Sequence, residues 1–232
     1  MSPLGTVAVC MRYPVKSVLG EQLDQLWLDR AGPVGDRIWG LRTADGRLGS
    51  GKNSHRFVRL DGMLQMSART TRTDVLLRLP DGRELTMTDT VLPEALAAVV
   101  RRTVAVDRAD GQPHHDAAPL HLVTTASLRW WADQAPEHEV SWQRTRANVV
   151  VDVPGSDRVE DGWVGRKLRV GDSEVEIVET TERCAMVTHA QAGLDHAAEL
   201  LRVLAPHDLN LGVYATVVVP GAVHVGDPVV AL

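Results

Sequence analysis

The chain has 232 residues, of which 44% are apolar and 24% are charged, and it carries a formal net charge of −5. These proportions are ordinary for a globular protein, and the length suffices for one large or two small domains with a buried core. The net negative charge argues against binding of the whole surface to nucleic acid or to an anionic membrane. We therefore expect no nucleic-acid or membrane partner, and any bound anion must be held by a local group of basic residues.

Signals for export or membrane insertion are not found in the sequence. It contains no run of eighteen apolar residues, and its first residues lack the basic segment and long apolar stretch of a secretory signal. The two cysteines, Cys10 and Cys184, could form one disulfide but are too sparse for a disulfide-stapled scaffold. These features indicate a reducing compartment, and we expect a cytoplasmic protein.

Strand patterns dominate the first half of the chain. Residues 7–15 are rich in β-branched and aromatic residues. Two Asp-Gly pairs, Asp45-Gly46 and Asp81-Gly82, have the sequence of tight hairpin turns, each flanked by predicted strands. A helix is predicted over residues 93–102, where a proline near the start and two arginines at the end suit the ends of a helix. Strands are predicted over residues 7–15, 23–28, 38–42, 75–79 and 84–88.

A polar, turn-rich segment at residues 107–116 precedes the second half, and we expect it to be a domain junction or an ordered connecting loop. Helices are predicted over residues 124–133, with Thr124 or Thr125 as the cap, and over residues 195–204. The glycines between the predicted strands of this half are typical of a strongly bent sheet or barrel. These strands cover residues 148–153, 167–170, 174–179, 213–219 and 229–232.

Together these elements predict a mainly β fold with a few helices, of the α+β class. We expect a β-rich N-terminal module over residues 1–107, packed against a β-barrel-like domain over residues 108–232. We expect three large side chains, Trp27, Trp39 and Trp163, to fill the core. Cys10 lies inside an apolar strand, which favours simple core packing for its thiol.

Cys184 is the thiol with the better access, because the strand before it should end near Glu179 and leave the cysteine in a loop. The neighbouring Arg183 favours the thiolate, whereas Glu179 and Glu182 oppose this effect. A lone cysteine is nevertheless more often an inert packing residue. The local pattern by itself therefore assigns no function to Cys184.

Other groups that could carry chemistry are ambiguous when each is taken alone. His114, His115 and Asp116 could suggest a metal site, but adjacent histidines in a polar loop are more often solvated. The Gly-Ser-Gly-Lys segment at 49–52 lacks the full pattern of a phosphate-binding loop, and no helix signal follows it. Basic residues near turns could hold phosphate oxygens only if the fold gathers them. The residues concerned are Lys16, Arg37, Arg144 and Arg146, with the Ser17 hydroxyl beside the first of them.

Several segments taken together resemble the MOSC superfamily, whose domain is named after the C-terminal part of molybdenum-cofactor sulfurase. Tyr-Pro-Val-Lys-Ser at 13–17 and Gly-Pro-Val-Gly-Asp-Arg-Ile-Trp at 32–39 are similar to signatures of the family's N-terminal β-barrel module. Arg-Ala-Asn at 146–148 and Arg-Cys at 183–184 resemble two motifs of the MOSC domain, with Ala147 in place of a proline. The other matches keep the family's order and cover residues 120–128, 163–171, 210–214 and 225–229.

The resemblance implies that the protein binds the molybdenum cofactor, in which the dithiolene of molybdopterin holds the metal. In amidoxime-reducing members a cysteine of the Arg-Cys motif ligates the molybdenum, and a thiolate is a suitably soft ligand. This role transfers to Cys184, which is therefore the candidate metal ligand and catalytic residue. The positions that align with the rest of the cofactor site are Lys16, Ser17, Arg37, Arg146, Asn148, Glu182, Arg183 and Tyr214.

The implied activity is that of an oxidoreductase that removes oxygen from N-hydroxylated or N-oxide small molecules. The sequence carries no ferredoxin-like cysteine cluster, so we expect a separate electron-transfer protein as partner. Residues 185–191 depart from the family's usual sequence, and His189 is the only residue there that we would test as an acid. The alternatives are a sulfur carrier with a Cys184 persulfide, a cofactor carrier without turnover, and a scaffold that has lost the cofactor.

Overall fold

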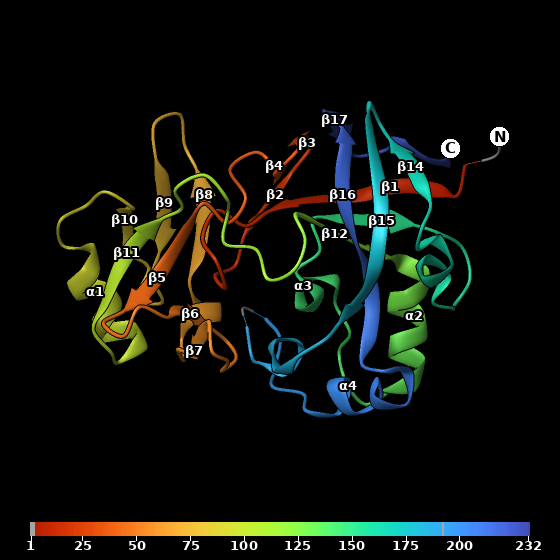
Figure 1. Ribbon diagram of the computed structural model, residues 1–232. Coiled ribbons are helices and arrows are strands. Elements are labelled where there is room, and N and C mark those ends of the chain that lie inside the picture. Colours follow the sequence, from red (N-terminus) through yellow and green to blue (C-terminus); the bar gives the residue numbers. More distant parts are fainter. Residues whose placement is uncertain (1–2, 192) are drawn as a thin grey trace.

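Two groups of β-strands, one in each half of the chain, make up most of the computed structural model, which describes residues 3–191 and 193–232 (Figure 1). Strands account for 39% of the residues and helices for 18%, which confirms the predicted mainly β fold. The strands of the first half are β1 Gly5–Arg12, β2 Glu21–Leu23, β3 Gln25–Asp29, β4 Gly32–Pro33, β5 Trp39–Thr43, β6 Leu48–Ser50, β7 Phe57–Arg59, β8 Ser67–Thr70, β9 Val75–Arg78, β10 Glu84–Thr86 and β11 Val104–Arg108.

The remaining elements lie mainly in the second half of the chain. Its strands are β12 Leu120–Thr124, β13 Val149–Asp152, β14 Lys167–Val170, β15 Ser173–Glu182, β16 Asn210–Val219, β17 Gly221–His224 and β18 Pro228–Ala231. The α-helices are α1 Leu92–Val100, α2 Thr125–Gln134, α3 Trp142–Thr145 and α4 Glu199–Arg202. Short 3-10 turns are η1 Met63–Gln65, η2 Val159–Trp163, η3 Ala185–Thr188 and η4 Ala205–His207.

The second half forms a closed seven-stranded β-barrel with the help of one strand from the first half. The strands follow the order β13-β12-β16-β15-β14-β18-β1, and pairing of β1 with β13 closes the ring. Neighbouring strands are antiparallel except β12 and β13, which are parallel and are joined through α2 and α3. Because β1 belongs to the ring, the start of the chain is hydrogen-bonded into the barrel of the second half.

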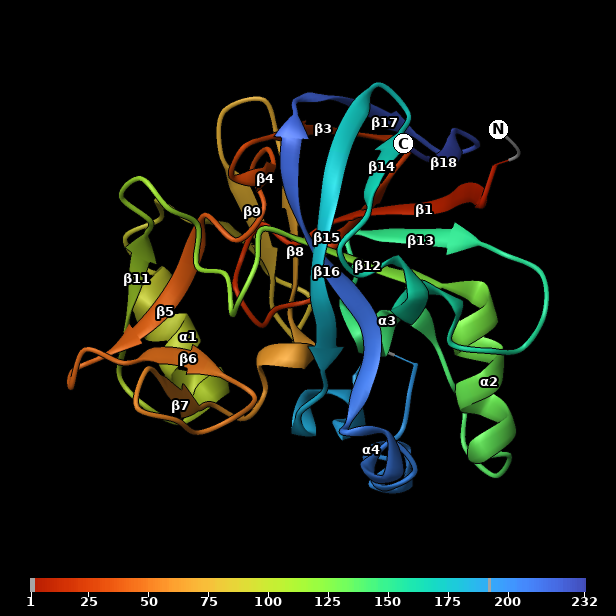
Figure 2. The ribbon, with the colours of Figure 1, turned by 45° about the vertical axis from the view of Figure 1, so that its right-hand side comes forward.

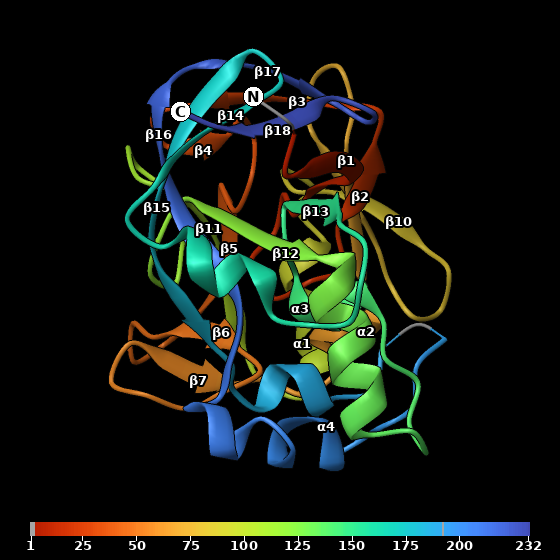
Figure 3. The ribbon, with the colours of Figure 1, turned by 90° about the vertical axis from the view of Figure 1, so that its right-hand side faces the viewer.

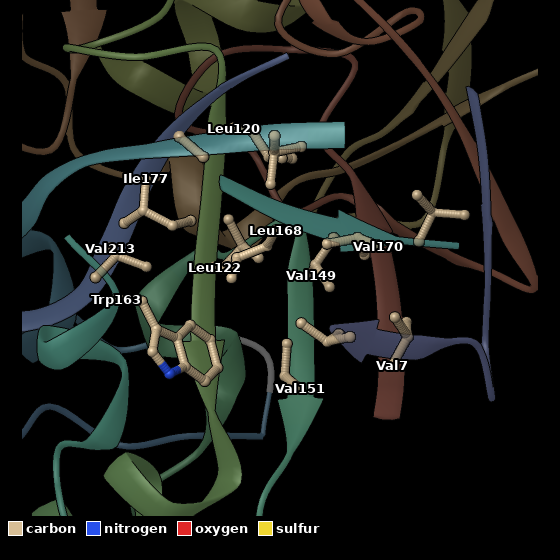
Figure 4. Packing of buried hydrophobic residues seen from close by; sticks show 14 of the residues in the cluster. Val7, Leu120, Leu122, Val149, Val151, Trp163, Leu168, Val170, Ile177 and Val213 are labelled. Atoms are coloured by element: carbon tan, nitrogen blue, oxygen red, sulfur yellow. The ribbon is translucent and has the colours of Figure 1, made fainter. Parts of the chain in front are cut away.

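The barrel interior is filled by apolar side chains from each of its strands. Figure 4 shows Val7, Leu122, Val149, Leu168 and Ile177 converging on this core, and all of them are buried. Burying a side chain of this size contributes roughly 1.5–3 kcal/mol relative to leaving it in water. The alternation of buried and exposed residues along β14 and the first half of β15 follows from this packing, since every second side chain points inward.

Strands β5 to β11 of the first half have a core of their own, whereas β3 packs into the barrel core through Leu26 and Leu28. Two sheets, β11-β5-β6-β7 and β10-β9-β8, pack with α1 around a separate apolar cluster, which includes Leu41, Leu77 and Leu96. This unit lies beside the barrel, as the views in Figures 1 and 2 both show. The barrel and this unit therefore have separate hydrophobic cores, and the loops between them can form a site.

Helices α2 and α4 lie on the same side of the barrel (Figure 3) and pack on each other through Trp131, whose indole nitrogen donates to the Leu200 carbonyl at 2.8 Å. The Thr124 side chain caps α2 by accepting from the Ser127 backbone nitrogen, as predicted. The side-chain hydroxyls of Thr124 and Ser127 both donate to the buried carboxylate of Glu160. Burial raises the pKa of that carboxyl group. The start of α2 is thereby anchored to η2.

Three local predictions were wrong in extent or burial. Trp27 is not a core residue, because its side chain on β3 is 55% exposed, whereas the unpredicted Trp131 is buried. Strand β15 continues past Glu179 to Glu182, because its pairing with β16 extends to Asn210. The predicted helix over residues 195–204 contracts to the single turn α4, and the 3-10 turn η4 follows it beyond the predicted range. Among the described residues, no helix combines the length and the apolar character needed to cross a membrane.

The barrel core makes a direct prediction for stability. Leu168 on β14 is 0% exposed, and we expect Leu168→Ala to lower the free energy of unfolding by about 3 kcal/mol through lost burial and the cavity left behind. Urea denaturation would measure this change. Val178 on β15 is 42% exposed and provides the control, since Val178→Ala should change the same quantity by less than about 0.5 kcal/mol. Equal losses for the two variants would contradict the assigned barrel interior.

Candidate functional site

A cavity of about 330 Å³ opens where the loops of the first unit meet the barrel, and it is lined by residues from both halves of the chain. All nine residues that the sequence predicts for a cofactor site lie in its wall. The first half supplies Lys16, Ser17 and Arg37, and the second supplies Arg146, Asn148, Glu182, Arg183, Cys184 and Tyr214. The fold therefore gathers residues that are up to about 200 positions apart in the sequence.

The backbone at this cavity adopts conformations that side chains disfavour. Ser17, Arg37 and Arg146 have φ angles of 61°, 52° and 56°. A residue other than glycine in this left-handed region costs the folded state roughly 1 kcal/mol or more. Such backbone strain tends to occur at functional sites. Arg146 adopts it as the residue that ends α3, directly after Thr145. The local strain turns these three side chains into the cavity wall.

Two of the arginines are held side by side by an aromatic ring and a buried carboxylate. The guanidinium carbons of Arg146 and Arg37 lie 4.4 Å and 5.0 Å from the centre of the Tyr13 ring. Arg37 also forms an ion pair with Asp36, whose side chain is 0% exposed. Burial, followed by the nearby positive charge of Arg37, lowers the pKa of Arg146 to about 10, which still leaves it charged at neutral pH.

Asn148 connects the two halves behind this cation pair. Its Nδ2 donates to Asp36 Oδ1 at 3.1 Å and to the Met11 carbonyl at 3.2 Å. Its Oδ1 accepts from the His121 backbone nitrogen at 3.3 Å and from Arg37 Nη1 at 3.4 Å. Because both ends of the amide are engaged, the clearest structural effect of Asn148 is to orient Arg37.

Two buried N–H groups in the wall lack a partner. Arg146 Nη2 and Arg183 Nε make no hydrogen bond to any of the residues that the structure describes. The other nitrogens of Arg183 are used, because Nη2 donates to the Thr145 carbonyl at 2.6 Å and Nη1 lies 3.4 Å from His121 Nε2. Burial and then the charge of Arg183 lower the pKa of His121 well below its usual value, so its neutral ring can accept this bond. An unpaired buried donor is costly unless a ligand accepts it.

A second pair of cations lies across the cavity. Lys16 Nζ donates to the His114 carbonyl at 2.8 Å and forms an ion pair with Asp116, which also pairs with Lys52 at 2.8 Å. Burial lowers the pKa of Lys16 to about 8. Burial alone would raise the pKa of Asp116, but the two lysines outweigh it and lower that pKa. Asp116 thus neutralises part of the positive charge.

The adjacent His114 and His115 were expected to be solvated, whereas the structure shows both of them half-buried. His115 and Asp116 line the cavity, and His115 Nε2 lies 2.9 Å from the Ala31 carbonyl. The metal site that these residues could have suggested is not formed, since the described part of the chain contains no group of three His, Cys, Asp or Glu side chains suited to a metal ion. Lys52 also lies in the wall, although its segment is no phosphate-binding loop.

Cys184 is the half-buried thiol of this cavity and follows the end of β15 by two residues. A negative charge on its sulfur would interact favourably with Lys52 and Arg183. Burial lowers the pKa of Arg183, and the charges of Tyr214 and then Cys184 oppose this effect. Cys10 differs, because it is fully buried in the barrel core, as predicted, and burial raises the pKa of its thiol to about 11. Of the two thiols, only that of Cys184 lies where it can reach a ligand in the cavity.

Some residues near the cysteine lie outside this cavity. Arg144 does not face it, although it is only two positions from Arg146. His189 Nε2 lies 2.9 Å from the Gly51 carbonyl, and the ring lines a neighbouring cavity of about 230 Å³. The structure thus gives no contact by which His189 could act as an acid beside Cys184. The backbone nitrogen of Arg183 donates to the Leu209 carbonyl at 2.8 Å, so the free donor of this residue is its side chain.

Sequence reasoning missed several residues of the wall. They include Ser50, Lys52, Asp116, His121, Thr145, Glu179 and Met186. Lys52 and Asp116 carry charges in polar loops, which is a weak signal that could have drawn attention to them. His121 lies within an apolar strand, and only its pairing opposite Tyr214 on β16 places it at the cavity. The ring centres of these two residues are 5.4 Å apart.

The Lys16 pKa predicts a pH-dependent affinity for anions. Since the pKa in the folded protein is about 8, Lys16 is charged at pH 7 and loses its proton as the pH rises to 9. We expect sulfate, whose charge is constant over this range, to bind roughly fivefold to tenfold more weakly at pH 9 than at pH 7. Isothermal titration calorimetry would measure the sulfate affinity at both pH values. Lys16→Arg keeps its charge and should remove the dependence, and an unchanged dependence in this variant would contradict the assignment.

Close packing of Gly51 on the cysteine loop gives a second prediction. A Cβ atom on Gly51 would overlap Met186 Sδ and lie 3.1 Å from His189 Cδ2. We expect Gly51→Ala to lower the free energy of unfolding by about 1 kcal/mol, because the flexible Met186 side chain must move its sulfur away from the new methyl group. Combining it with Met186→Ala should remove most of this cost, which a double-mutant cycle in urea would show. Strictly additive effects would mean that the two residues do not touch.

Comparison with solved structures places the fold among known ones. The crystal structure of the YuaD protein from Bacillus subtilis covers 98% of this chain and 92% of its own, with 16% identical residues and a TM-score of 0.51. YiiM from Escherichia coli covers 98% of this chain and 69% of its own, with 12% identity and a TM-score of 0.47. YiiM from Geobacillus stearothermophilus covers 50% and 54%, with 14% identity and a TM-score of 0.38. No curated protein matches the chain.

Two family models account for nearly the whole sequence. The model of the MOSC N-terminal beta barrel domain matches residues 4–125, and the model of the MOSC domain matches residues 110–230. These matches confirm the resemblance carried by the Tyr-Pro-Val-Lys-Ser, Arg-Ala-Asn and Arg-Cys segments. The protein belongs to the MOSC domain family.

Proposed function

We propose that the protein is a molybdenum-cofactor-binding oxidoreductase that reduces N-hydroxylated or N-oxide small molecules with electrons from a separate protein. The observation that carries the proposal is one cavity in which a half-buried thiol lies among five Lys and Arg side chains. Membership of a family named after molybdenum-cofactor sulfurase supports this cofactor. The substrate class and the electron donor rest on the likeness of the Arg-Cys segment to amidoxime-reducing members.

The donor groups of the cavity fit an anionic pterin cofactor. A phosphate group needs several charge-assisted donors, and Arg146 Nη2 and Arg183 Nε are buried N–H groups that no described residue satisfies. The Ser17 hydroxyl and the Lys16 ammonium group lie in the same wall. The volume of about 330 Å³ is within the usual range for a small-molecule or cofactor site.

Each part of the wall then has a defined task. The cofactor, when bound, supplies the two-electron redox chemistry that reduces an N–O bond. Cys184 would ligate the metal through its thiolate, and the cations Lys52 and Arg183 would stabilise that negative charge. The residues that would hold the phosphate and the pterin are Lys16, Ser17, Arg37, Arg146, Asn148, Glu182, Arg183 and Tyr214.

Molybdenum content and turnover test the proposal together. The wild type, purified from a host that makes molybdopterin, should contain near-stoichiometric molybdenum and should reduce an N-hydroxylated amidine with a reduced dye as electron source. Cys184→Ser should lower this turnover by at least about 100-fold, because it removes the soft metal ligand. The variant should keep its fold by circular dichroism and most of its pterin, measured by fluorescence after release.

The second cysteine provides a matched control. Cys10→Ala removes a thiol outside the cavity, so it should leave molybdenum content and turnover unchanged even if it lowers stability. Full turnover in Cys184→Ser would exclude the ligand role. Metal-free wild type that accepts cyanide-releasable sulfur on Cys184 would replace the proposal with sulfur transfer.

A further inference from the structure

Arg144 is a buried cation whose hydrogen bonds all go to backbone carbonyl groups. Its side chain is 2% exposed, and it lies in α3 rather than in the cavity wall. Nη1 donates to the carbonyls of Val187 and His189, both at 3.3 Å, and Nη2 donates to that of Asp195 at 2.7 Å. Nε donates to the Glu139 carbonyl at 3.2 Å. Three of these four acceptors belong to the segment that follows Cys184.

Helix α3 also forms a hydrogen bond with Arg183, the residue before the cysteine. The carbonyl of Thr145, next to Arg144, accepts from Arg183 Nη2 at 2.6 Å. Between these two attachments the Cys184 carbonyl accepts from the Val187 backbone nitrogen at 3.2 Å and starts the turn η3. The chain is therefore hydrogen-bonded to α3 both before and after Cys184, through the Arg183 side chain and the Val187 carbonyl. Only the short turn η3 separates these two contacts.

The chemistry of this contact requires an arginine. Burial lowers the pKa of Arg144, and the nearby charges of Glu139 and Asp195 oppose this effect, so the guanidinium group stays charged. A planar group with five donors can reach carbonyls in several directions at once, whereas an ammonium group concentrates its donors at one point. A lysine could therefore keep the charge but could not span Val187, His189 and Asp195 together.

We propose that Arg144 is a positioning residue for Cys184, which fixes residues 185–191 and Asp195 so that the thiol faces the cavity. The inference rests on the proposed function in that Cys184 is taken as the ligand-binding group. Arg144 itself does not line the cavity. Its loss should therefore loosen the loop around the thiol while the barrel and the cation pairs stay in place.

The test uses the full-length protein without metal, so it does not depend on turnover. Cys10 is fully buried, so a small maleimide reports on Cys184 alone, which mass spectrometry of the labelled peptide would verify. We expect Arg144→Lys to speed labelling of Cys184 about tenfold, because the loop opens more often once its carbonyl bonds are lost. Amide hydrogen exchange over residues 185–191 and 193–197 should accelerate by a similar factor, with no change in the barrel strands.

A matched arginine separates this role from general destabilisation. Arg129 also donates to loop carbonyls, those of Val153 and Gly155, but this loop lines neither cavity. Arg129→Lys should leave Cys184 labelling at the wild-type rate, even at a urea concentration that equalises the stability of the two variants. If Arg144→Lys labels and exchanges like the wild type, the positioning role is wrong.

A second variant keeps the inference testable if the lysine adapts or folds poorly. Arg144→Ala leaves a space that a free guanidinium ion can enter, and millimolar guanidinium should slow Cys184 labelling back toward the wild-type rate, whereas ammonium at equal ionic strength should not. Equal effects of the two ions would overturn the proposal. If the wild type is metal-free but the labelling changes occur, only the oxidoreductase proposal is rejected. If the wild type contains molybdenum but both Arg144 variants label like the wild type, only the positioning role is rejected.

Discussion

The buried carboxylate of Asp36 is the group on which the arrangement of the site depends. A fully buried negative charge must be paired and hydrogen-bonded, and its partners come from three parts of the chain. The Tyr13 backbone nitrogen donates to it at 2.7 Å, Arg37 pairs with it, and Asn148 Nδ2 donates at 3.1 Å. These contacts tie the end of β1, the approach to β5 and the start of β13 together, and they allow Arg37 and Arg146 to lie on one ring despite their like charge.

The same arrangement explains how a protein with a net charge of −5 can present a positive cavity. Lys16, Arg37 and Lys52 come from the first unit, while Arg146 and Arg183 come from the barrel side, so the positive field exists only when the two halves pack together. Asp116 reduces this charge without removing it. Two arginine N–H groups remain open, and low-dielectric surroundings strengthen any bond that an anion makes to them.

The thiol has a different kind of support from the cations. Strand β15 ends two residues before Cys184, at the cavity, and the short turn η3 begins directly after it. On either side of Cys184, hydrogen bonds of the Arg183 and Arg144 side chains connect this segment to α3. Gly51 lets the first unit approach the same turn closely enough to contact Met186. The position of the cysteine is thus set jointly by both halves, as expected of a site built between two cores.

The sequence by itself determined the class of fold, the hairpin turns, the burial of Cys10 and, through ordered motifs, nine residues of the cavity wall. Tertiary structure alone decided which loops meet, because spacing along a chain carries no record of contacts between distant segments. It placed Lys52, Asp116 and His121 at the cavity and left Trp27 in solvent. It also separated Arg144 from Arg146, since α3 ends between them and the left-handed backbone of Arg146 turns its side chain toward the cavity.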